Sequence, residues 1–331
     1  MARVYLSRLN SIFSNLAFED RMFELGRSPV LLLYRNEKTI VVGRNQNPWK
    51  ECYVERMQRD GVQLCRRKSG GGAVYQDLGN SVFGFLTTGQ AGVDFKQRNN
   101  AVLVRALEHL GVRAEVSGRN DLTMDGRKIS GSAYKLSLRK ERLLALHHGT
   151  MLFSVDKEGL QKYLNPSKAK LLSKGVQSVA ARVVNISELH PGLNHEKWCS
   201  AMIEAFSEAN GGAEVHNLEK LDRETEAIAA KYLDWDWRFG TSPAFTHSLE
   251  KRFDWGTIDL NLQVEGGVVK EAKVFSDSLY PDFIDRLNAA FIGLKYGPEG
   301  LVELRIRLQD CSEAPLPQYI EDLATWLHSA M

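Results

Sequence analysis

The chain has 331 residues, of which 43% are hydrophobic and 25% are charged, so it can bury a sizeable core and its length predicts two domains. Its formal net charge of +2 is too small for a protein that binds nucleic acid over a broad surface, and any basic site must be local. No apolar run of about 18 residues predicts a membrane span, and four scattered cysteines without a CxxC pair argue against structural zinc and against a disulfide framework. We therefore expect a soluble protein of a reducing intracellular compartment.

Strands and isolated helices alternate over residues 1–240. The predicted strands lie at 4–6, 30–34, 39–43, 63–67, 73–76, 81–86, 114–117, 122–124, 128–132 and 147–153. The predicted helices lie at 14–25, 50–60, 95–110, around Leu160 and Tyr163, and at 195–209 and 218–234. The strands 30–34 and 39–43 are expected to form a hairpin, and an Asp-Gly turn joins 122–124 to 128–132. This mixture indicates an α+β fold with mixed sheets flanked by helices, not a doubly wound sheet.

The clearest linker is Gly-Thr-Ser-Pro at residues 240–243. Beyond it, strand-like segments at 245–253, 256–264 and 268–275 predict a meander, and helices are expected near 281–294 and 316–330. We therefore expect a large domain at 1–240 and a small α+β domain at 241–331. Residues 1–18 contain two arginines and no acid, as transit peptides do, but the strand and helix predicted there make them part of the fold.

The stretch RRKSGGGAVYQDLGN, residues 66–80, holds three consecutive glycines behind three basic residues. Gly70, Gly71 and Gly72 have no Cβ, so this backbone can approach a ligand closely, and arginine side chains bind phosphate or carboxylate in bidentate fashion. The sequence contains neither the GxxxxGK[ST] phosphate loop nor the GxGxxG dinucleotide motif, so another phosphate geometry is expected. The structural alternative is a glycine-rich hairpin with a basic rim.

A second group lies in GRNDLTMDGRKISGSAYK, residues 118–135. Lys128, just after the Asp-Gly turn, can stabilise negative charge that develops on a carboxyl or acyl-phosphate oxygen. Asp121, on the preceding strand, could hold a metal ion or orient the substrate. The structural alternative is a solvated hairpin with charged tips.

Two further motifs are weaker signals. HHGTMLF, residues 147–153, could line a site, although a histidine on an apolar strand is more often a core residue, and we do not interpret the pair as a metal site. In KLLSKGVQSVAARVVN, residues 170–185, Lys174, Gly175 and Ser178 could close over an acyl phosphate, as a mobile loop does. Glycine, hydroxyls and lysine also describe an ordinary surface loop.

Together these motifs resemble the lipoate-protein ligase and lipoyltransferase family. The resemblance extends over nearly the whole chain, with the motifs in family order. Its residues are VVGRNQNPWKEC (41–52), RRKSGGGAVYQDLGN (66–80), SGRNDL (117–122), RKISGSAY (127–134), HHGTMLF (147–153), KGVQSVAARVVN (174–185) and WDWRFGTSPAF (235–245). It implies a catalytic domain of the type shared with biotin protein ligases, followed by a small accessory domain.

The resemblance also implies a two-step reaction. Lipoate attacks the α-phosphate of Mg·ATP to give lipoyl-AMP and pyrophosphate, and the adenylate then acylates a lysine of a lipoyl domain. The implied cofactors are ATP and Mg²⁺. The implied partners are lipoyl domains of 2-oxoacid dehydrogenase acyltransferase subunits and the glycine-cleavage H protein, with no nucleic acid and no membrane. The implied compartment is the cytoplasm, or the mitochondrial matrix in a eukaryote.

The functional residues of the family carry over to matching positions. Lys128 would contact the carboxylate and the α-phosphate in both steps, Asp121 would hold Mg²⁺, and Lys174, Gly175 and Ser178 would cover the adenylate. The residues expected to bind nucleotide and lipoate are Arg67, Ser69, Gly70, Gly71, Gly72, Ala73, Val74, Tyr75, Asn120, Asp121, Lys128, His148, Gly149 and Thr150.

Some positions depart from the family pattern. Gln76 stands where histidine is more frequent and Lys68 where a small residue is, so we expect the rim of the loop to differ in charge. The GRGRxGR-type loop of biotin ligases is missing, and no cysteine matches the nucleophile of octanoyltransferases. The alternatives are a lipoyltransferase that uses preformed lipoyl-AMP or a lipoylated carrier, and a non-catalytic nucleotide or RNA binder that uses the basic glycine loop. Preference for lipoate over octanoate stays open, because an apolar pocket separates such analogues by only about 1 to 3 kcal/mol.

Overall fold

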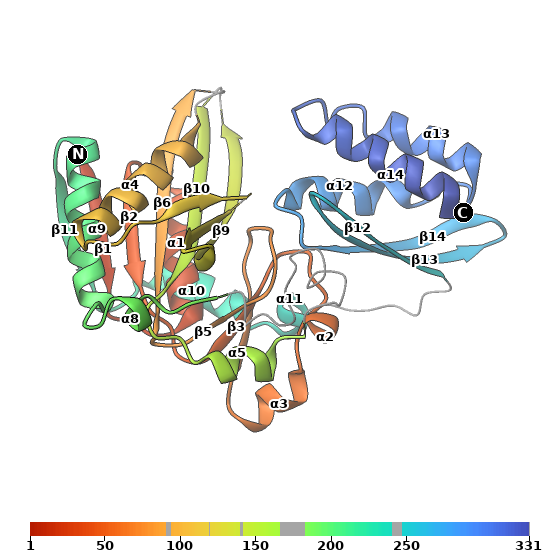
Figure 1. Ribbon diagram of the computed structural model, residues 1–331. Helices are drawn as coiled ribbons and strands as arrows, with labels where there is room; N and C mark the ends of the chain where they lie inside the picture. The colour runs from red at the N-terminus through yellow and green to blue at the C-terminus, as the bar shows by residue number, and fades with distance from the viewer. Residues whose placement is uncertain (91–93, 119, 140–141, 166–182, 240–246, 331) are drawn as a thin grey trace. The chain divides into compact units, whose positions relative to one another are not determined.

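The computed structural model describes residues 1–90, 94–118, 120–139, 142–165, 183–239 and 247–330. The chain divides into two compact units (Figure 1). The first comprises Met1–Val42, Pro48–Arg67 and Ala73–Arg238, and the second comprises Gly43–Asn47, Lys68–Gly72 and Phe239–Met331. Two short loops of the N-terminal sequence therefore belong to the unit built by the C-terminal sequence.

The first unit is organised around an eight-stranded sheet in the order β11-β1-β2-β6-β10-β9-β8-β7. These strands are β1 (Ala2–Ser7), β2 (Val30–Tyr34), β6 (Asn80–Gln90), β7 (Glu115–Ser117), β8 (Asp121–Met124), β9 (Arg127–Arg139), β10 (Arg142–Leu152) and β11 (Ala213–Leu218). β1 pairs in parallel with β2 and β11, and all the other neighbours are antiparallel. The prediction of an α+β fold with mixed sheets is confirmed.

Helices cover both faces of this sheet. α4 (Phe95–His109) and α9 (His195–Asn210) lie on one face (Figure 1), where Leu31 and Leu33 of β2 join their apolar side chains in the largest core cluster. α1 (Ile12–Glu24) packs on the other face against Val30 and Leu32, because successive side chains of a strand point to opposite faces. α10 (Arg223–Tyr232) packs beside α1.

A second, three-stranded sheet has the order β4-β3-β5, formed by β3 (Thr39–Val42), β4 (Gln63–Arg66) and β5 (Val74–Gln76). The prediction of a hairpin between 30–34 and 39–43 is therefore wrong: β2 pairs with β1 and β6, and β3 pairs with β4 and β5. The physical reason is that every residue of β2 is buried. A continuous apolar run suits a central strand with both faces covered better than one arm of an exposed hairpin.

The other described elements before residue 240 are short helices, namely α2 (Pro48–Glu51), α3 (Val54–Arg59), α5 (Lys157–Tyr163), α8 (Ile186–Leu189) and α11 (Trp235–Phe239). The helix predicted at 50–60 is thus two short helices that are interrupted at residues 52 and 53. The helix predicted at 218–234 begins only at Arg223, and strand β11 precedes it. The turn between β8 and β9 is confirmed, since Asp125 and Gly126 both have positive φ, 51° and 71°.

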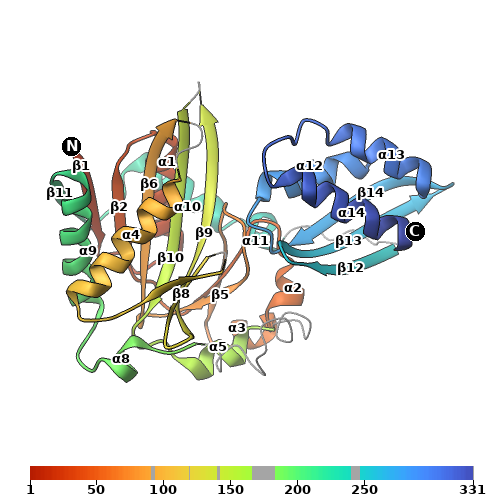
Figure 2. The same cartoon turned by 45° about the horizontal axis from the view of Figure 1, so that its top comes forward.

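The second unit contains an antiparallel sheet of β12 (His247–Phe253), β13 (Gly256–Glu265) and β14 (Val268–Ser276), as the meander prediction requires. α12 (Pro281–Phe291), α13 (Pro298–Arg307) and α14 (Leu316–Ala330) lie on one of its faces (Figure 2) and close a separate core. α13 was not expected from the sequence. Among the described residues of the chain, no helix has the length and apolar character that a membrane crossing needs.

Candidate active site

Lys128 and Asp121 form an ion pair between neighbouring strands. The Nζ atom of Lys128 lies 2.8 Å from Oδ1 of Asp121, and the two side chains are 20% and 12% exposed. Gly131 faces Asp121 across the strands, and a Cβ at Gly131 would overlap Nζ of Lys128. The lysine side chain therefore lies flat across Gly131, and a larger residue at this position would require the ammonium group to shift.

A β-bulge makes this arrangement possible. The register places Leu122 opposite Ser130 but Thr123 opposite Lys128, so Ile129 is an extra residue. Ile129 and Leu122 are buried in the core on the α4 and α9 face. Because the bulge shifts the alternation of side chains by one, Lys128 joins Asp121 on the opposite face, which α1 covers.

The chain segment that follows residue 182 is fixed at the same position. The amide of Val184 donates a hydrogen bond to the carbonyl oxygen of Lys128 at 3.0 Å, and Val183 forms a parallel bridge with Lys128. This is the end of the motif expected to cover the adenylate. Lys174, Gly175 and Ser178 of that motif lie outside the described residues.

His148 reaches the same face of the sheet from β10. Its Nδ1 atom lies 2.6 Å from Oε1 of Glu19 on α1, and the two side chains are 8% and 3% exposed. Thr150, two residues further along β10, pairs with Gly131 and so lies beside the Lys128 site. Gly149 between them has no room for a Cβ, which would meet the ring of Phe83 at 2.6 Å. Four predicted residues on three strands, Asp121, Lys128, His148 and Thr150, therefore share one face of the sheet.

His147 belongs to the core on the other face, as the core interpretation of the histidine pair predicts. Its ring lies 4.9 Å from that of Tyr134 and 5.7 Å from that of Phe83, measured between centroids. Neither ring nitrogen has a hydrogen-bond partner among the described residues. Burial lowers the pKa of His147 to about 3, with smaller contributions from His148 and Lys96. This imidazole is neutral at physiological pH.

Arg67 is a buried cation at the end of β4. Its Nη1 atom donates a hydrogen bond to the carbonyl oxygen of Val41 at 3.1 Å. Burial lowers the pKa of Arg67 to about 10, and the charge of Glu19 acts in the opposite direction. Arg66 donates instead to the carbonyl oxygens of Trp237 and Arg238, each at 2.8 Å. Arg67 is therefore the arginine of this pair that interacts with the Glu19 carboxylate beside His148.

The glycine loop is part of the second unit. The amide of Gly71 donates a hydrogen bond to the carbonyl oxygen of Ser278 at 3.0 Å, and a Cβ at Gly70 would overlap that same oxygen. Gly71 has φ of 92°, which favours glycine. The carbonyl oxygen of Ser69 accepts from the amide of Arg44, at 2.9 Å. In this structure Gly70 and Gly71 therefore pack closely against protein backbone at Ser278.

Other predicted residues have structural contacts. Asn120 donates through its side chain to the carbonyl oxygen of Ser132. Ala73 and Val74 lead into β5, where the ring of Tyr75 is buried. Gln76 is also buried and accepts a hydrogen bond from Asn36 at 2.7 Å, so its expected place on a charged rim is wrong. The long polar Gln76 side chain is satisfied inside the protein, where it does not add to the charge of a surface.

Sequence reasoning missed Glu19, because it lies 129 positions from His148 in the chain and in the middle of an amphipathic helix. A buried acid on the apolar side of α1 is the signal that could have found it. Three of the four cysteines lack the low pKa of a nucleophile: burial raises the pKa of Cys52 and of Cys199 to about 12, and it also raises that of Cys65.

Comparison with known proteins defines the class. A family model described as the lipoyl protein ligase A/B catalytic domain matches residues 11–207, and one described as the bacterial lipoate protein ligase C-terminus matches residues 242–327. The chain therefore combines the catalytic and C-terminal domains of one class of enzyme.

Individual relatives narrow the class to one family. Lipoate-protein ligase A of Psychrobacter cryohalolentis is 39% identical, over 99% of this chain and 98% of its own length. The structure of P. falciparum LipL1 in complex with lipoate has a TM-score of 0.85 at 29% identity and covers 99% of this chain and 100% of its own. A structure of the bipartite lipoate protein ligase of Thermoplasma acidophilum, from a study of that ligase and its E2 lipoyl domain, has a TM-score of 0.60 at 25% identity and covers 74% of this chain and 99% of its own. The chain belongs to the lipoate-protein ligase family, as the motifs predicted.

Proposed function

We propose that the protein is an ATP-dependent lipoate-protein ligase. In the first step a carboxylate oxygen of lipoate attacks the α-phosphorus of ATP, and the bond to pyrophosphate breaks. In the second step the ε-amine of an acceptor lysine attacks the acyl carbon, AMP leaves, and the amine loses a proton. The name of the curated relative supports this proposal, since ligases couple bond formation to nucleotide cleavage.

The ion pair of Lys128 and Asp121 is the observation that supports the mechanism best. Adenylate formation brings a carboxylate close to a phosphate, so the main barrier is electrostatic repulsion and in-line positioning. A fixed ammonium group neutralises charge on both reacting anions without reorganising. Asp121 holds this group in place, and Thr150 and His148 line the same face of the sheet.

Mg²⁺ is proposed as the counter-ion of the ATP phosphates. Asp121 offers an oxygen ligand, and Mg²⁺ is usually bound through one or two carboxylates with substrate phosphates and water completing its shell. The sequence left two roles open for Asp121, to hold a metal ion or to orient the substrate. The ion pair of Asp121 with Lys128 favours the second role. When bound, the ion would supply neutralisation of phosphate charge, while the chain's own residues orient the acyl group.

We assign catalysis to residues 1–240 and an accessory role to 241–331. The matches of the two family models support these boundaries. We further propose that Arg67, the glycine-loop segment 69–75, Asn120 and the 148–150 segment bind nucleotide and lipoate, and that Lys174, Gly175 and Ser178 cover the adenylate. The acceptors would be lipoyl domains of 2-oxoacid dehydrogenase acyltransferase subunits and the glycine-cleavage H protein. An E2 lipoyl domain is the partner named with the Thermoplasma acidophilum ligase.

Two measurements test the proposal. Pyrophosphate release is followed with ATP, Mg²⁺ and lipoate, and the mass of an unmodified lipoyl domain is followed with and without ATP. We expect pyrophosphate and a lipoylated domain only when ATP is present. Lys128→Gln should lose both products, and Lys197→Gln, at an exposed lysine of α9, should retain both.

The outcomes separate the possible activities. Transfer from synthetic lipoyl-AMP without pyrophosphate release from ATP and lipoate would identify a lipoyltransferase and contradict the ligase proposal. Full activity of Lys128→Gln would contradict the assignment of the site.

A further inference from the structure

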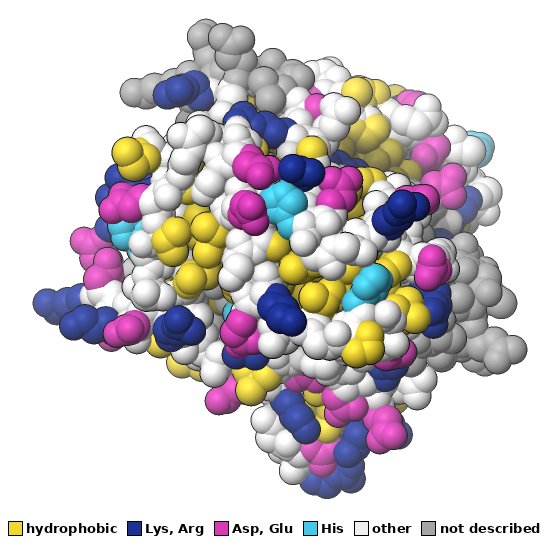
Figure 3. Space-filling model, turned by 60° about the vertical axis from the view of Figure 1, so that its left-hand side comes forward, with side chains coloured by type: hydrophobic (Ala, Val, Ile, Leu, Met, Phe, Trp, Pro, Cys, Tyr) yellow, Lys and Arg dark blue, Asp and Glu magenta, His cyan; other side chains and the backbone are white. Residues whose placement is uncertain are grey.

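A group of potential metal ligands lies on the α4 and α9 face of the large sheet. His109 is the last residue of α4, and Glu204 and Glu208 stand one turn apart on α9. Nδ1 of His109 lies 3.3 Å from Oε2 of Glu204, and Nε2 lies 3.6 Å from Oε1 of Glu208. One ligand atom from each residue lies within 4.8 Å of the others, and no further group of three such residues occurs within the described parts of the chain. Figure 3 looks onto this side of the first unit, where histidine and acidic side chains stand next to one another.

The charges around His109 do not balance. Glu204 and Glu208 lie beside the imidazole, and Glu108 precedes it on α4. Among the described residues, Arg105 binds Glu208 at 3.2 Å and Glu108 at 3.5 Å. With a neutral imidazole, three carboxylates and one guanidinium leave two negative charges in excess. A divalent cation would neutralise this excess.

One ring nitrogen of His109 lies next to a carboxylate but makes no hydrogen bond to a described residue. Nδ1 of His109 is buried and has no hydrogen-bond partner among the described residues, although the Glu204 carboxylate lies beside it. A buried polar atom without a hydrogen bond costs free energy, and coordination to a cation removes that cost. A metal ion would bind a neutral imidazole through its lone pair.

The helices that carry the three ligands are fixed before any ion binds. Leu103 and Leu107 of α4 and Met202 and Phe206 of α9 are buried in the main core cluster. The side chains of Glu204 and Glu208 are exposed enough to adjust their rotamers, at 64% and 47%. A preorganised backbone with adjustable carboxylates lets a metal bind without refolding the protein.

We propose that His109, Glu204 and Glu208 form a binding site for a divalent transition metal of the Zn²⁺ class. Imidazole nitrogen with carboxylate oxygen suits Zn²⁺, whereas Mg²⁺ and Ca²⁺ prefer sites of oxygen alone. The bound ion cross-links the end of α4 to α9. It lies across the sheet from Lys128, so it stabilises the fold and takes no part in acyl transfer.

Zinc binding and thermal unfolding test the site in the full-length, tag-free protein after chelator treatment. Isothermal titration should give one Zn²⁺ bound per chain, and Zn²⁺ should raise the unfolding temperature, because an ion that binds the folded state stabilises it. Loss of a residue that merely hydrogen-bonds to a metal ligand already weakens metal affinity by about tenfold or more. His109 would bind the metal directly, so His109→Gln should weaken binding by more than that. Ca²⁺ and Mg²⁺ should give no comparable shift.

The matched control is His216→Gln. His216 also pairs with a glutamate, Glu214, at 3.4 Å, but no third ligand joins it among the described residues. This variant should bind Zn²⁺ as the wild type does, and Glu208→Gln should behave like His109→Gln. Equal zinc binding by His109→Gln, or no binding by the wild type, would overturn the proposal. All three variants change partly exposed side chains, and titration below the unfolding temperature reports on folded protein.

Discussion

A methyl group at Gly131 would occupy the position of the Lys128 ammonium group. Gly131→Ala should therefore displace Lys128 from Asp121, and we expect a fall in kcat of about 10²-fold, the cost of a misplacement of about 1 Å in a catalytic group. Steady-state lipoylation of a lipoyl domain measures this effect.

Gly126→Asn is the matched control for Gly131→Ala, because Gly126 lies in the same hairpin and no atom lies within 4 Å of a Cβ added there. Asparagine also tolerates the left-handed φ of 71° at this position. It should retain wild-type kcat. Wild-type activity in Gly131→Ala would show that the position of Lys128 is not critical.

Protonation of His147 should make stability depend on pH. Its pKa is lowered to about 3 by burial, below the ordinary value of 6.5 that it regains on unfolding. Between these values the unfolded state binds more protons than the folded state, so stability rises with pH and falls on acidification below about pH 6.5. Urea unfolding at several pH values should show a flatter profile for His147→Leu, whereas exposed His328→Gln should match the wild type. An unchanged slope in His147→Leu would mean that other groups control acid stability.

The contact between the glycine loop and Ser278 should make Gly70 intolerant of a side chain. Gly70→Ala places a Cβ onto the Ser278 carbonyl oxygen, and overpacking of this kind costs about 1 to 3 kcal/mol. The free energy of unfolding of the second unit, followed by its tryptophans Trp255 and Trp326, is the quantity to measure. Gly266→Ala, where nothing lies within 4 Å, should cost only its backbone strain of about 1 kcal/mol. Equal losses in the two variants would contradict the packing role.

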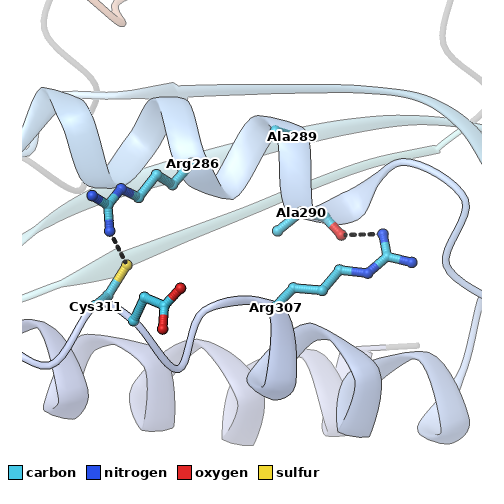
Figure 4. A pocket seen from close by; sticks show the side chains of 6 residues that line it. Arg286, Ala289, Ala290, Arg307 and Cys311 are labelled. Carbon is cyan, nitrogen blue, oxygen red and sulfur yellow. Dashed lines mark hydrogen bonds between the residues drawn. The ribbon is translucent and has the colours of Figure 1, made fainter.

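Cys311 should be the first thiol to react with iodoacetamide in the folded protein. It lines a cavity of about 390 Å³ with Arg286 and Arg307, and Nη1 of Arg286 lies 3.5 Å from its sulfur (Figure 4). The cavity gives a small reagent access to this sulfur, and the positive guanidinium stabilises negative charge that develops on it during attack, whereas burial raises the pKa of Cys52 and Cys199 to about 12.

Peptide mapping after brief alkylation identifies the modified cysteine. Arg286→Gln should slow the reaction of Cys311 severalfold, and urea should expose all four cysteines to the reagent. Faster labelling of Cys52 or Cys199 than of Cys311 in folded protein would contradict this order.

Local patterns predicted those parts of the fold whose causes are local. The Asp125–Gly126 turn, α4 with its stop at Gly111, and the C-terminal meander all follow from nearby residues. β11 escaped prediction because it is a largely exposed edge strand without an apolar alternation. The apolar run of β2 indicates a central strand, but its partners β1 and β6 are set by the whole sheet and could not be read from the run itself.

The residues of the candidate site could be named from motifs, whereas their geometry could not be predicted. Lys128 and Asp121 were identified from a motif, and the structure adds the bulge at Ile129 that places them on one face. The pairing of His148 with Glu19 joins residues far apart in the chain, so it needs the packing of α1 on the sheet. The backbone contact of Gly71 with Ser278 likewise joins distant segments and has no signal in the loop itself.

The two faces of the large sheet differ in chemical character. On the α1 side the buried groups include the ionisable side chains of Glu19, Asp20 and His148, while the main cluster on the α4 and α9 side is apolar and the buried polar groups beside it include His147, Thr87 and Asn99. Substitutions between the sheet and α9 should therefore act mainly on stability, because they leave the face that carries Lys128, Asp121 and His148 unchanged.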